Sequence, residues 1–479
     1  MPLILGAQSA TASGDVITNS CRFNNGDSPY FASDFAGTGS SSAAIATYSF
    51  WLKLGLEDTR ATLISGKDDT SNYMKVRFAD DGSGHYFAVY GISPACDLRS
   101  TKIFKDPAAW YNVVMAFDTA QAVSTNRIKV WINGEQITSW STGTFIAQNE
   151  ELFLTKSDDL EIGAYNNTEH FDGYMAEVVC IDGTALDETS FGEFDGDTPT
   201  VWKPKDVSGL SVGTKGYRLN FGDSAALGDD VSGNNNDFTE TNIVAADQGT
   251  DSPSNNFCVL NPLDNYYPAS TLSEGNLKVS TNAANKTFNT STFAVTKGKW
   301  YWEVKITTTA SDSAEVGIAS VPSTQSAGGG GELNDSAGNY EYRSDGTKGN
   351  NNSNTSYGDT WNTDDDIVGV ALDLDNLKLY FSKNGVWQDS SDPESGATGT
   401  GAAFTVTAPA SQTLASSINA YTPALGEEGA QTDVFELNFG SPIVAPSSGN
   451  ADGDGYGDFE YAVPSGYYAL CTKNLAEYG

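Results

Sequence analysis

Residues 366–385 read Asp-Ile-Val-Gly-Val-Ala-Leu-Asp-Leu-Asp-Asn-Leu-Lys-Leu-Tyr-Phe-Ser-Lys-Asn-Gly. Every second side chain from Val368 to Leu374 is apolar, which is the pattern of a strand with one buried face. A second alternating run follows and ends at Asn384-Gly385. Asparagine and glycine tolerate positive φ at both central positions of a two-residue turn, as a right-twisted hairpin requires. The stretch therefore predicts antiparallel strands joined by tight turns.

The first half of the chain contains the same unit. The apolar run Tyr111–Phe117 is followed by the alternating run Arg127–Ile132 and then by Asn133-Gly134. In both halves an apolar strand runs into an aspartate, a second strand follows, and an Asn-Gly turn closes the unit. Two similarly built antiparallel β-sandwiches are the economical interpretation, and chance similarity between hairpins is the alternative.

Length and composition favour an all-β chain of two domains. The sequence has 479 residues with 49 glycines, 23 phenylalanines and 22 tyrosines, the mixture expected of strands joined by polar turns. We expect an N-terminal arm over 1–20, a first sandwich over 21–228, a polar linker over 229–256 and a second sandwich over 257–479. The glycine- and asparagine-rich stretch 328–354 predicts a long surface loop.

The charge balance excludes one class of partner. With 62 acidic against 26 basic residues, the net charge of -36 repels phosphate backbones, so we expect no nucleic-acid partner. No run of 18 apolar residues is present, so we expect no membrane insertion, and the first residues lack the pattern of a signal peptide. The five cysteines show no C-x-x-C spacing, which predicts neither a disulfide framework nor a zinc site and favours folding in a reducing cytoplasm.

Few residues offer catalytic chemistry. The sequence has two histidines, His85 and His170, and both lie in predicted turn or frame segments. The nearest acidic run to a glucanase motif, Asp158-Asp-Leu-Glu161, lacks the Glu-x-Asp-x-x-Glu spacing that places an acid and a nucleophile on one strand face. We therefore expect that the protein is not an enzyme.

One loop offers carboxylates at the spacing of a calcium site. The residues Asp452, Asp454 and Asp458 lie in a glycine-rich stretch, which resembles the start of an EF-type loop. The closing glutamate is missing, since Val463 stands at the twelfth position. A Ca²⁺ site and an acidic turn without an ion are both open.

A sugar ligand requires an exposed aromatic ring with polar groups beside it. Aromatic residues in predicted loops supply the candidates, and the alternative is that they cap the edges of the sandwiches. The candidates are Tyr73 and Tyr165 in the first domain and Tyr357, Trp361 and Trp387 in the second.

Both halves resemble known families. The phrases Asp106–Val114, Asn126–Gly134 and His170–Glu177 are similar to laminin G-like, concanavalin A-type lectin modules over roughly residues 15–200. The second half resembles a SPRY domain in five ordered phrases: Lys299–Val304, Tyr357–Trp361, Asp366–Asp373, Phe381–Gly385 and Phe435–Gly440. Trp361 and Trp387 fall within or beside these frame motifs. The resemblance implies two tandem concanavalin A-like sandwiches.

The phrases that join the domains resemble the laminin G-plus-SPRY proteins of tailed phages that infect marine bacteria. These phrases are Ser190–Glu193, Val201–Lys205, Ser232–Asp237, Asn256–Leu263 and Ala469–Leu475. The resemblance implies a virion structural protein, assembled in the host cytoplasm and displayed on the virion surface as a tail-associated or tail-fibre adhesin. Its expected partners are other virion proteins, further copies of itself, and a host-surface glycan or receptor. We expect the arm 1–20 to dock on such a neighbour.

Three alternatives remain beside the adhesin. The first alternative is a capsid decoration or head-fibre protein, the second is a polysaccharide depolymerase, and the third is a free carbohydrate-binding protein. Its position in an intact particle separates the first alternative from a tail adhesin. Cleavage of a polysaccharide supports the second, and absence from purified particles supports the third.

Overall fold

The computed structural model divides the chain into two compact units. Residues 12–255 form one unit, and residues 256–479 form the other together with residues 1–11. The structure describes residues 4–5, 17–33, 43–55, 60–80, 85–156, 159–265, 270–282, 286–310, 312–321, 331–410, 420–429 and 431–479. Most of the predicted arm 1–20 therefore lies outside the described residues. Its strand β1 (Ile4–Leu5) pairs in parallel with β24 (Phe293–Ala294).

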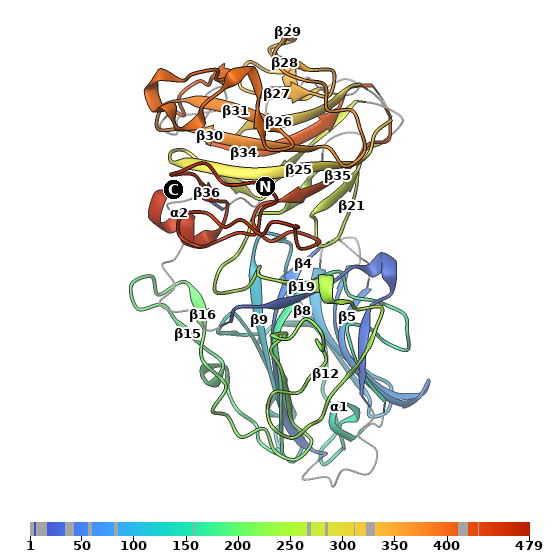
Figure 1. Cartoon of the computed structure of the whole chain (residues 1–479). Helices are drawn as coiled ribbons and strands as arrows, with labels where there is room; N and C mark the ends of the chain where they lie inside the picture. The colour runs from blue at the N-terminus through green and yellow to red at the C-terminus, as the bar shows by residue number, and fades with distance from the viewer. Residues whose placement is uncertain are drawn as a thin grey trace. The chain divides into compact units, whose positions relative to one another are not determined.

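The first unit contains two antiparallel sheets, drawn in blue to green in Figure 1. The first sheet has the order β11 (Glu135–Gln136), β10 (Ile128–Ile132), β9 (Trp110–Asp118), β4 (Ile45–Leu54), β14 (Gly173–Asp182), β2 (Ser20–Phe23), β19 (Gln248–Gly249), with β17 (Tyr217–Leu219) on β14. The second has the order β12 (Trp140–Thr144), β8 (Cys96–Ile103), β7 (His85–Gly91), β6 (Asn72–Asp80), β5 (Arg60–Asp69), β13 (Asp159–Ile162), β3 (Tyr30–Ser33), β18 (Thr239–Thr241).

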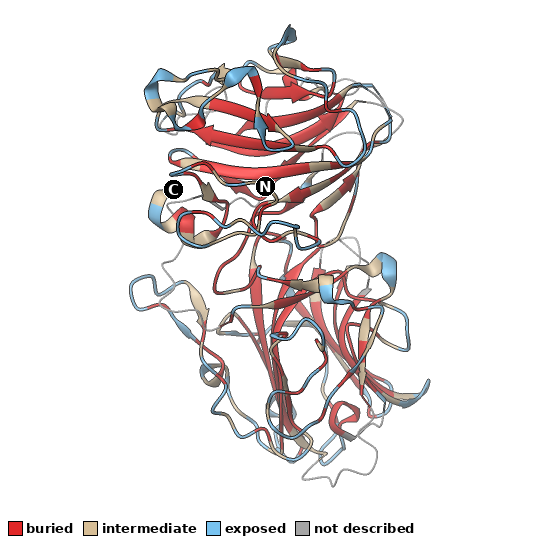
Figure 2. Cartoon of the chain, viewed as in Figure 1, coloured by how far each residue is buried: buried red, intermediate tan, exposed pale blue. Residues whose placement is uncertain are grey.

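The core of the first unit lies between these sheets. Alternate residues of β4 and β9, such as Phe50 and Met115, share one hydrophobic cluster with Met74, Val76 and Phe78 of β6. Because side chains alternate along a strand, this choice of inward residues leaves the other residues of β6 on the outer surface of the second sheet. Figure 2 shows that the strands of each unit are largely buried.

The second unit is built in the same way. One sheet has the order β20 (Leu260–Asn265), β23 (Thr287–Ser291), β34 (Ala420–Glu427), β26 (Ala314–Val321), β27 (Tyr340–Arg343), β28 (Thr347–Asn350), β29 (Ser353–Ser356). The other has the order β21 (Thr271–Ser273), β22 (Lys278–Ser280), β35 (Val434–Asn438), β25 (Lys299–Thr308), β30 (Ile367–Asp373), β31 (Lys378–Lys383), β32 (Val386–Trp387). Two short strands join this second sheet, β33 (Phe404–Thr405) on β31 and β36 (Tyr468–Ala469) in parallel with β25.

Aromatic contacts join the two sheets of the second unit. The ring centres of Tyr342 on β27 and Phe381 on β31 lie 5.5 Å apart, and Trp300 and Trp302 of β25 are buried. The opposite surface of β25 is also covered, since Tyr301 packs with Phe459 from the C-terminal segment. The prediction of an all-β chain with two tandem concanavalin A-like sandwiches is confirmed.

The two predicted Asn-Gly turns have the same hydrogen bonds. Asn133 and Asn384 have φ values of 50° and 46°, and the glycine after each is also left-handed. The Oδ1 atom of Asn133 accepts the backbone N–H of Asn112 at 2.7 Å, and Asn384 accepts that of Ile367 at 2.8 Å. The side chain of each asparagine thereby bonds its turn to the strand that precedes the hairpin, β9 in the first unit and β30 in the second. The asparagine also supplies the left-handed conformation that the turn needs.

Two segments differ from the expectation for them. The expected linker 229–256 contains β18 and β19, which pair with β3 and β2 inside the first unit. Its polar side chains serve the fold: Asp230 accepts backbone N–H groups from Arg218, Ser232 and Asn236. The described part of the expected loop 328–354 contains β27, β28 and the first half of β29. The sequence did not reveal them, because such short strands carry no sustained apolar alternation.

The remaining elements are short. The α-helices are α1 (Phe153–Lys156) and α2 (Thr472–Tyr478), and β15 (Gly192–Phe194) pairs with β16 (Trp202–Pro204). Among the described residues, no helix is long and apolar enough to cross a membrane. The 3-10 helices are η2 (Asn25–Asp27), η3 (Ser124–Asn126), η4 (Glu188–Ser190), η5 (Ala245–Asp247), η6 (Leu333–Asp335), η7 (Gln388–Ser390) and η8 (Pro393–Thr398).

Candidate ligand-binding face of the first sandwich

Strand β6 carries aromatic and basic side chains on its outward positions. Tyr73, Lys75 and Arg77 alternate with the core residues described above, so they share the outer surface of the second sheet. On the neighbouring strand β7, Tyr90 lies directly opposite Lys75 in the register. We call the surface formed by Tyr73, Lys75, Arg77 and Tyr90, with Tyr165 and Glu169, the tyrosine face.

A loop between β13 and β14 brings the last two residues to this surface. Asn166 and Asn167 both adopt left-handed φ, and Tyr165 and Thr168 exchange backbone hydrogen bonds around them. Asparagine tolerates this conformation better than most residues, which explains a tight turn at this point. The turn places the Tyr165 ring 4.7 Å from that of Tyr73, so the structure brings together the two first-domain candidates predicted from sequence.

Lys75 lies at the centre of the tyrosine face. Its Nζ atom is 4.2 Å from the ring centre of Tyr165 and 5.6 Å from that of Tyr73, within the range of cation–π attraction. The same atom donates to Oε2 of Glu169 at 2.7 Å. Burial alone would raise the pKa of Glu169, but the hydrogen bond from Lys75 and the charges of Lys75 and Arg77 lower it. The carboxylate therefore stays ionised and fixes the position of the ammonium group.

The tyrosines differ in how much they offer a ligand. Tyr73 is only 7% exposed, whereas Tyr90 and Tyr165 are half-buried and keep part of each ring open. Burial and the neighbouring Tyr165 and Tyr90 raise the pKa of Tyr73 to about 12, so its hydroxyl is neutral at physiological pH. Tyr73 therefore contributes packing within the tyrosine face, whereas Tyr90 and Tyr165 offer exposed ring surface to a ligand.

Charges on this sheet surface are matched. Lys67 pairs with Asp159 at 3.1 Å and Glu161 at 3.7 Å, and Arg99 pairs with Asp97 at 2.9 Å. Together with the Lys75–Glu169 pair, these contacts make the surface nearly neutral in a strongly acidic chain. Open tyrosine rings beside fixed amides, carboxylates and guanidinium groups are the features that bind and orient a sugar ring.

The aromatic candidates of the second sandwich form no comparable surface. Trp361 is 1% exposed, and the Tyr357 ring packs at 5.3 Å from Tyr342, so both contribute to the packing of the domain. Trp387 is half-buried and packs edge-on against Tyr301 at 6.4 Å. The assignment of Trp361 to a ligand site is thereby corrected, because its ring faces protein atoms.

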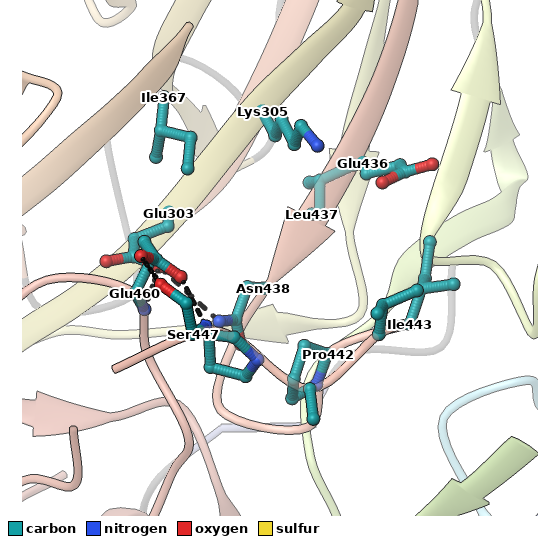
Figure 3. A pocket seen from close by; sticks show the side chains of 13 residues that line it. Glu303, Lys305, Ile367, Glu436, Leu437, Asn438, Pro442, Ile443, Ser447 and Glu460 are labelled. Atoms are coloured by element: carbon teal, nitrogen blue, oxygen red, sulfur yellow. Dashed lines mark hydrogen bonds between the residues drawn. The ribbon is translucent and has the colours of Figure 1, made fainter. Parts of the chain in front are cut away.

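A hollow of about 190 Å³ lies elsewhere on the second sandwich (Figure 3). Lys305 and Glu436 lie toward one side of it, and Glu303 and Glu460 lie together on the other. Glu303 accepts the backbone N–H groups of Glu460 at 2.9 Å and Tyr461 at 2.8 Å. Lys305 and Glu436 are each paired with an oppositely charged residue outside the hollow. Glu303 thereby holds the C-terminal segment in place, which favours a structural role for the charged groups of the hollow.

The acidic loop at 452–458 is also structural. One carboxylate oxygen of Asp452 accepts the backbone N–H groups of Asp454 and Tyr456, and the other accepts Ala469 N–H and Asn474 Nδ2. Asp454 accepts the hydroxyl of Tyr478 at 2.8 Å. Within the described part of the chain, Asp452, Asp454 and Asp458 are not grouped closely enough to share an ion. Of the two alternatives left open by the sequence, these contacts favour the acidic turn, in which the Asp452 carboxylate fastens helix α2.

Four residues of the tyrosine face, including Arg77 on β6, were not predicted from the sequence. Lys75, Tyr90 and Glu169 lie on different segments, and each has an ordinary neighbourhood in the sequence. The available signal was the alternation Tyr73-x-Lys75-x-Arg77, which places the three side chains on one face of a strand.

Family models match both units. The model described as the concanavalin A-like lectin/glucanases superfamily matches residues 25–189, and the SPRY domain model matches residues 299–413. The chain carries a concanavalin A-like domain followed by a SPRY domain. The tyrosine face therefore belongs to the concanavalin A-like domain, and the hollow belongs to the C-terminal unit that contains the SPRY domain.

Similar solved structures share little sequence with the chain. The SPRY domain of human HERC1 is 15% identical, with 37% of this chain and 96% of that chain covered and a TM-score of 0.28. A putative carbohydrate binding protein from Bacteroides ovatus is 19% identical, with 48% and 60% covered and a TM-score of 0.30. Domain 4 of AbnA, an extracellular arabinanase from Geobacillus stearothermophilus in complex with arabinotriose, is 18% identical, with 30% and 64% covered and a TM-score of 0.24. No curated protein matches the sequence.

Proposed function

We propose that the concanavalin A-like domain binds a carbohydrate through the tyrosine face. The observation that carries the proposal is the pair of half-buried rings, Tyr90 and Tyr165, whose centres lie 6.0 Å and 4.2 Å from Nζ of Lys75 in the largely buried Lys75–Glu169 ion pair. The rings supply apolar faces for the C–H groups of a sugar. Nearby amides and carboxylates accept or donate to its hydroxyls. The family model of this domain includes lectins, which supports the proposal.

The proposed activity is binding without hydrolysis. A retaining or inverting glycosidase needs one carboxyl group that donates a proton and a second carboxylate opposite it, and both must be available to the substrate. On this surface Glu169 is engaged by Lys75, and Asp159 and Glu161 share Lys67. These pairings commit the carboxylates to neighbouring cations, so binding fits them better than general acid catalysis.

A glycan array with the full chain tests the proposal. Tyr165→Ala and Tyr90→Ala each remove one half-open ring, and we expect either change to weaken binding of the best glycan about tenfold. Phe194→Ala is the matched control, because this exposed aromatic residue lies on β15, outside the second sheet that carries the tyrosine face. Unchanged binding in both tyrosine variants would contradict the proposal. Release of shorter sugars from the bound polysaccharide would favour the depolymerase.

We further propose that the protein acts on the surface of a phage particle, as an adhesin for a host-surface glycan. The support is the set of joining phrases, from Ser190–Glu193 to Ala469–Leu475, that resemble phage laminin G-plus-SPRY proteins. Mass spectrometry of purified particles tests it, and antibody labelling under the electron microscope distinguishes a tail position from capsid decoration. Absence of the protein from particles that infect normally would overturn this proposal and leave the glycan proposal standing.

A further inference from the structure

The outer surface of a sheet in the second sandwich carries buried glutamates. Strands β26 and β27 turn Val316 and Tyr342 toward the other sheet, so Glu315, Glu341 and Arg343 point the opposite way. Glu315 lies opposite Arg343 in the register of these strands. Two more glutamates and one lysine join them from other segments. We call Glu315, Glu332, Glu341, Glu428, Arg343 and Lys286 the glutamate cluster.

The segment around η6 covers this surface. Leu333 packs with Phe288, Ala319 and Ala424 over the sheet, and its backbone N–H donates to Oε2 of Glu315 at 2.9 Å. The cover leaves Glu315 and Glu341 with 0% exposure. Burial of a carboxylate away from water is costly unless hydrogen bonds or opposite charges compensate it.

Glycines make the room for these carboxylates. A Cβ atom at Gly349 would lie 2.4 Å from Oε1 of Glu341, and one at Gly426 would lie 3.0 Å from Oε2 of Glu315. Any larger residue at Gly349 would collide with the buried carboxylate. The glycine at position 349 therefore leaves the space that the Glu341 carboxylate fills.

The compensating charges fall short. Arg343 pairs with Glu428 and lies 3.6 Å from Glu315 and 3.7 Å from Glu341, and Lys286 pairs with Glu332 and Glu428. The four carboxylates of the cluster thus face two cations, and Asp345 outside the cluster also lies 3.9 Å from Arg343. Oε1 of Glu315 and both carboxylate oxygens of Glu341 are buried without a hydrogen-bond partner. When all six residues are ionised, the cluster lacks two positive charges for neutrality.

We propose that the glutamate cluster is a binding site for one Ca²⁺ ion, ligated by the carboxylates of Glu315, Glu332 and Glu428. One oxygen from each of these residues lies within 4.8 Å of the others, and two oxygens bound to one Ca²⁺ are at most about 5 Å apart. An ion of charge +2 brings the cluster to neutrality. Lys286, which is 39% exposed, has an open route to solvent when the ion takes its place between Glu332 and Glu428.

The donor set favours Ca²⁺ among biological cations. The three ligands are carboxylates. Zinc and copper sites usually contain histidine or cysteine, so this donor set does not favour either metal. Mg²⁺ retains several of its waters, and the fully buried Glu315 leaves little room for them. Ca²⁺ accepts carboxylates in one or two contacts and adapts to an irregular arrangement.

Protons are the competing way to neutralise the cluster. Burial raises the pKa of Glu315 to about 8, and burial together with the charge of Glu315 raises the pKa of Glu341 well above its ordinary value. Burial therefore makes both carboxylates costly to ionise unless a cation lies beside them.

Isothermal titration calorimetry of the full chain with CaCl₂, after treatment with a chelator, tests the site at pH 8. We expect saturable binding by the wild type. We expect Glu332→Gln, in a partly exposed position, to weaken it at least about tenfold by removing one ligand charge. Lys286→Ala removes the competing ammonium group and is expected to bind at least as tightly as wild type. Glu436→Gln makes the same chemical change outside the cluster and is the matched control.

Hydrogen exchange gives a local measure. We expect Ca²⁺ to slow the exchange of backbone amides over residues 331–345 in the wild type and in Lys286→Ala, and to leave Glu332→Gln unchanged. Absence of binding at millimolar CaCl₂, or equal affinity in Glu332→Gln, would overturn the proposal. A Lys286→Ala variant that loses stability and gains no Ca²⁺ response would show that the lysine is the resident cation of the cluster.

Discussion

The tyrosine face and the glutamate cluster use one architectural device in opposite ways. Each lies on the outer surface of a sheet beneath a loop, with a basic residue beside a glutamate: Lys75 with Glu169 in the first, and Lys286 with Glu332 in the second. On the tyrosine face every carboxylate has a cation and aromatic rings stay partly open. In the glutamate cluster carboxylates outnumber cations, and Glu315 and Glu341 at its centre are fully buried.

The difference shows how charge balance decides what a covered surface does. A surface whose charges are matched needs no further ion, which favours a neutral ligand. A sealed surface with excess negative charge needs protons or a cation before it is stable.

The largest effect is expected from Arg343→Met in the glutamate cluster. Arg343 is the cation closest to Glu315 and Glu341, so its loss leaves buried carboxylates unpaired and lowers the free energy of unfolding by about 3–5 kcal/mol. Urea unfolding followed by hydrogen exchange of the second unit measures it. Lys305→Met, a partly exposed residue paired with the exposed Asp365, is the control and is expected to change little. A loss equal to that of the control would show that the cluster is already neutral without Arg343.

A pH series distinguishes the two regions, because Glu315 and Glu169 are expected to change the free energy of unfolding with pH in opposite directions. The pKa of Glu315 is about 8 in the fold against an ordinary value of 4.5, so its protonated form stabilises the second unit below pH 4.5. That stability is lost as pH rises from about 4.5 to 8. Thermal unfolding from pH 5 to 8 measures the slope, and Glu315→Gln is expected to flatten it, since glutamine does not titrate. A slope unchanged in Glu315→Gln would assign it to the overall acidity of the chain.

The first unit is expected to respond to pH in the opposite direction through Glu169. Its lowered pKa contributes stability above pH 4.5 that is lost as pH falls through the folded value. Lys75→Met removes the partner that lowers this pKa, and we expect it to cost about 1–3 kcal/mol. Urea unfolding at pH 7 and pH 4 measures both effects. A Lys75→Met variant with unchanged acid sensitivity would show that Arg77 alone holds the Glu169 carboxylate ionised.

The smallest effects are expected where the two units are alike. Asn133→Ala and Asn384→Ala each lose a side-chain acceptor and force alanine into left-handed φ, at a cost of about 1–2 kcal/mol apiece. We expect equal losses in the free energy of unfolding of the two units, measured by urea unfolding. Such losses would give a reference value for comparing the other substitutions. Clearly unequal losses would show that one turn is supported by contacts that the other lacks.

Much of the fold followed from alternation and turns. The Asn-Gly units predicted β9 to β11 and β30 to β32, because strands with one buried face alternate and two-residue turns need left-handed residues. Strands β27, β28 and β29 were missed. In Tyr340-Glu-Tyr-Arg the alternation lasts only four residues and places charged side chains on a buried face, where a pattern based on hydrophobicity predicts solvent.

The candidate sites followed less well. Tyr73 and Tyr165 were chosen as aromatic residues in predicted loops, and the structure joins them. Trp361 was chosen on the same grounds and is buried, since an aromatic residue near a loop packs inward as readily as outward. The glutamate cluster draws on residues 286, 315, 332–343 and 428, and no spacing in the sequence indicates that these segments meet.

The shared Asn-Gly turns bear on how a newly synthesised chain reaches this structure. Each turn closes a loop of a few residues, so the hairpins β10–β11 and β31–β32 form on the microsecond timescale. Other pairings wait for distant partners: Phe23 on β2 pairs with Gly173 on β14, and Ser20 pairs with Gly249 near the end of its unit. The first unit therefore completes its sheets only after residue 249 has been made. A ribosome stalled before that point would hold a chain whose hairpins are formed and whose β2 edge is still open.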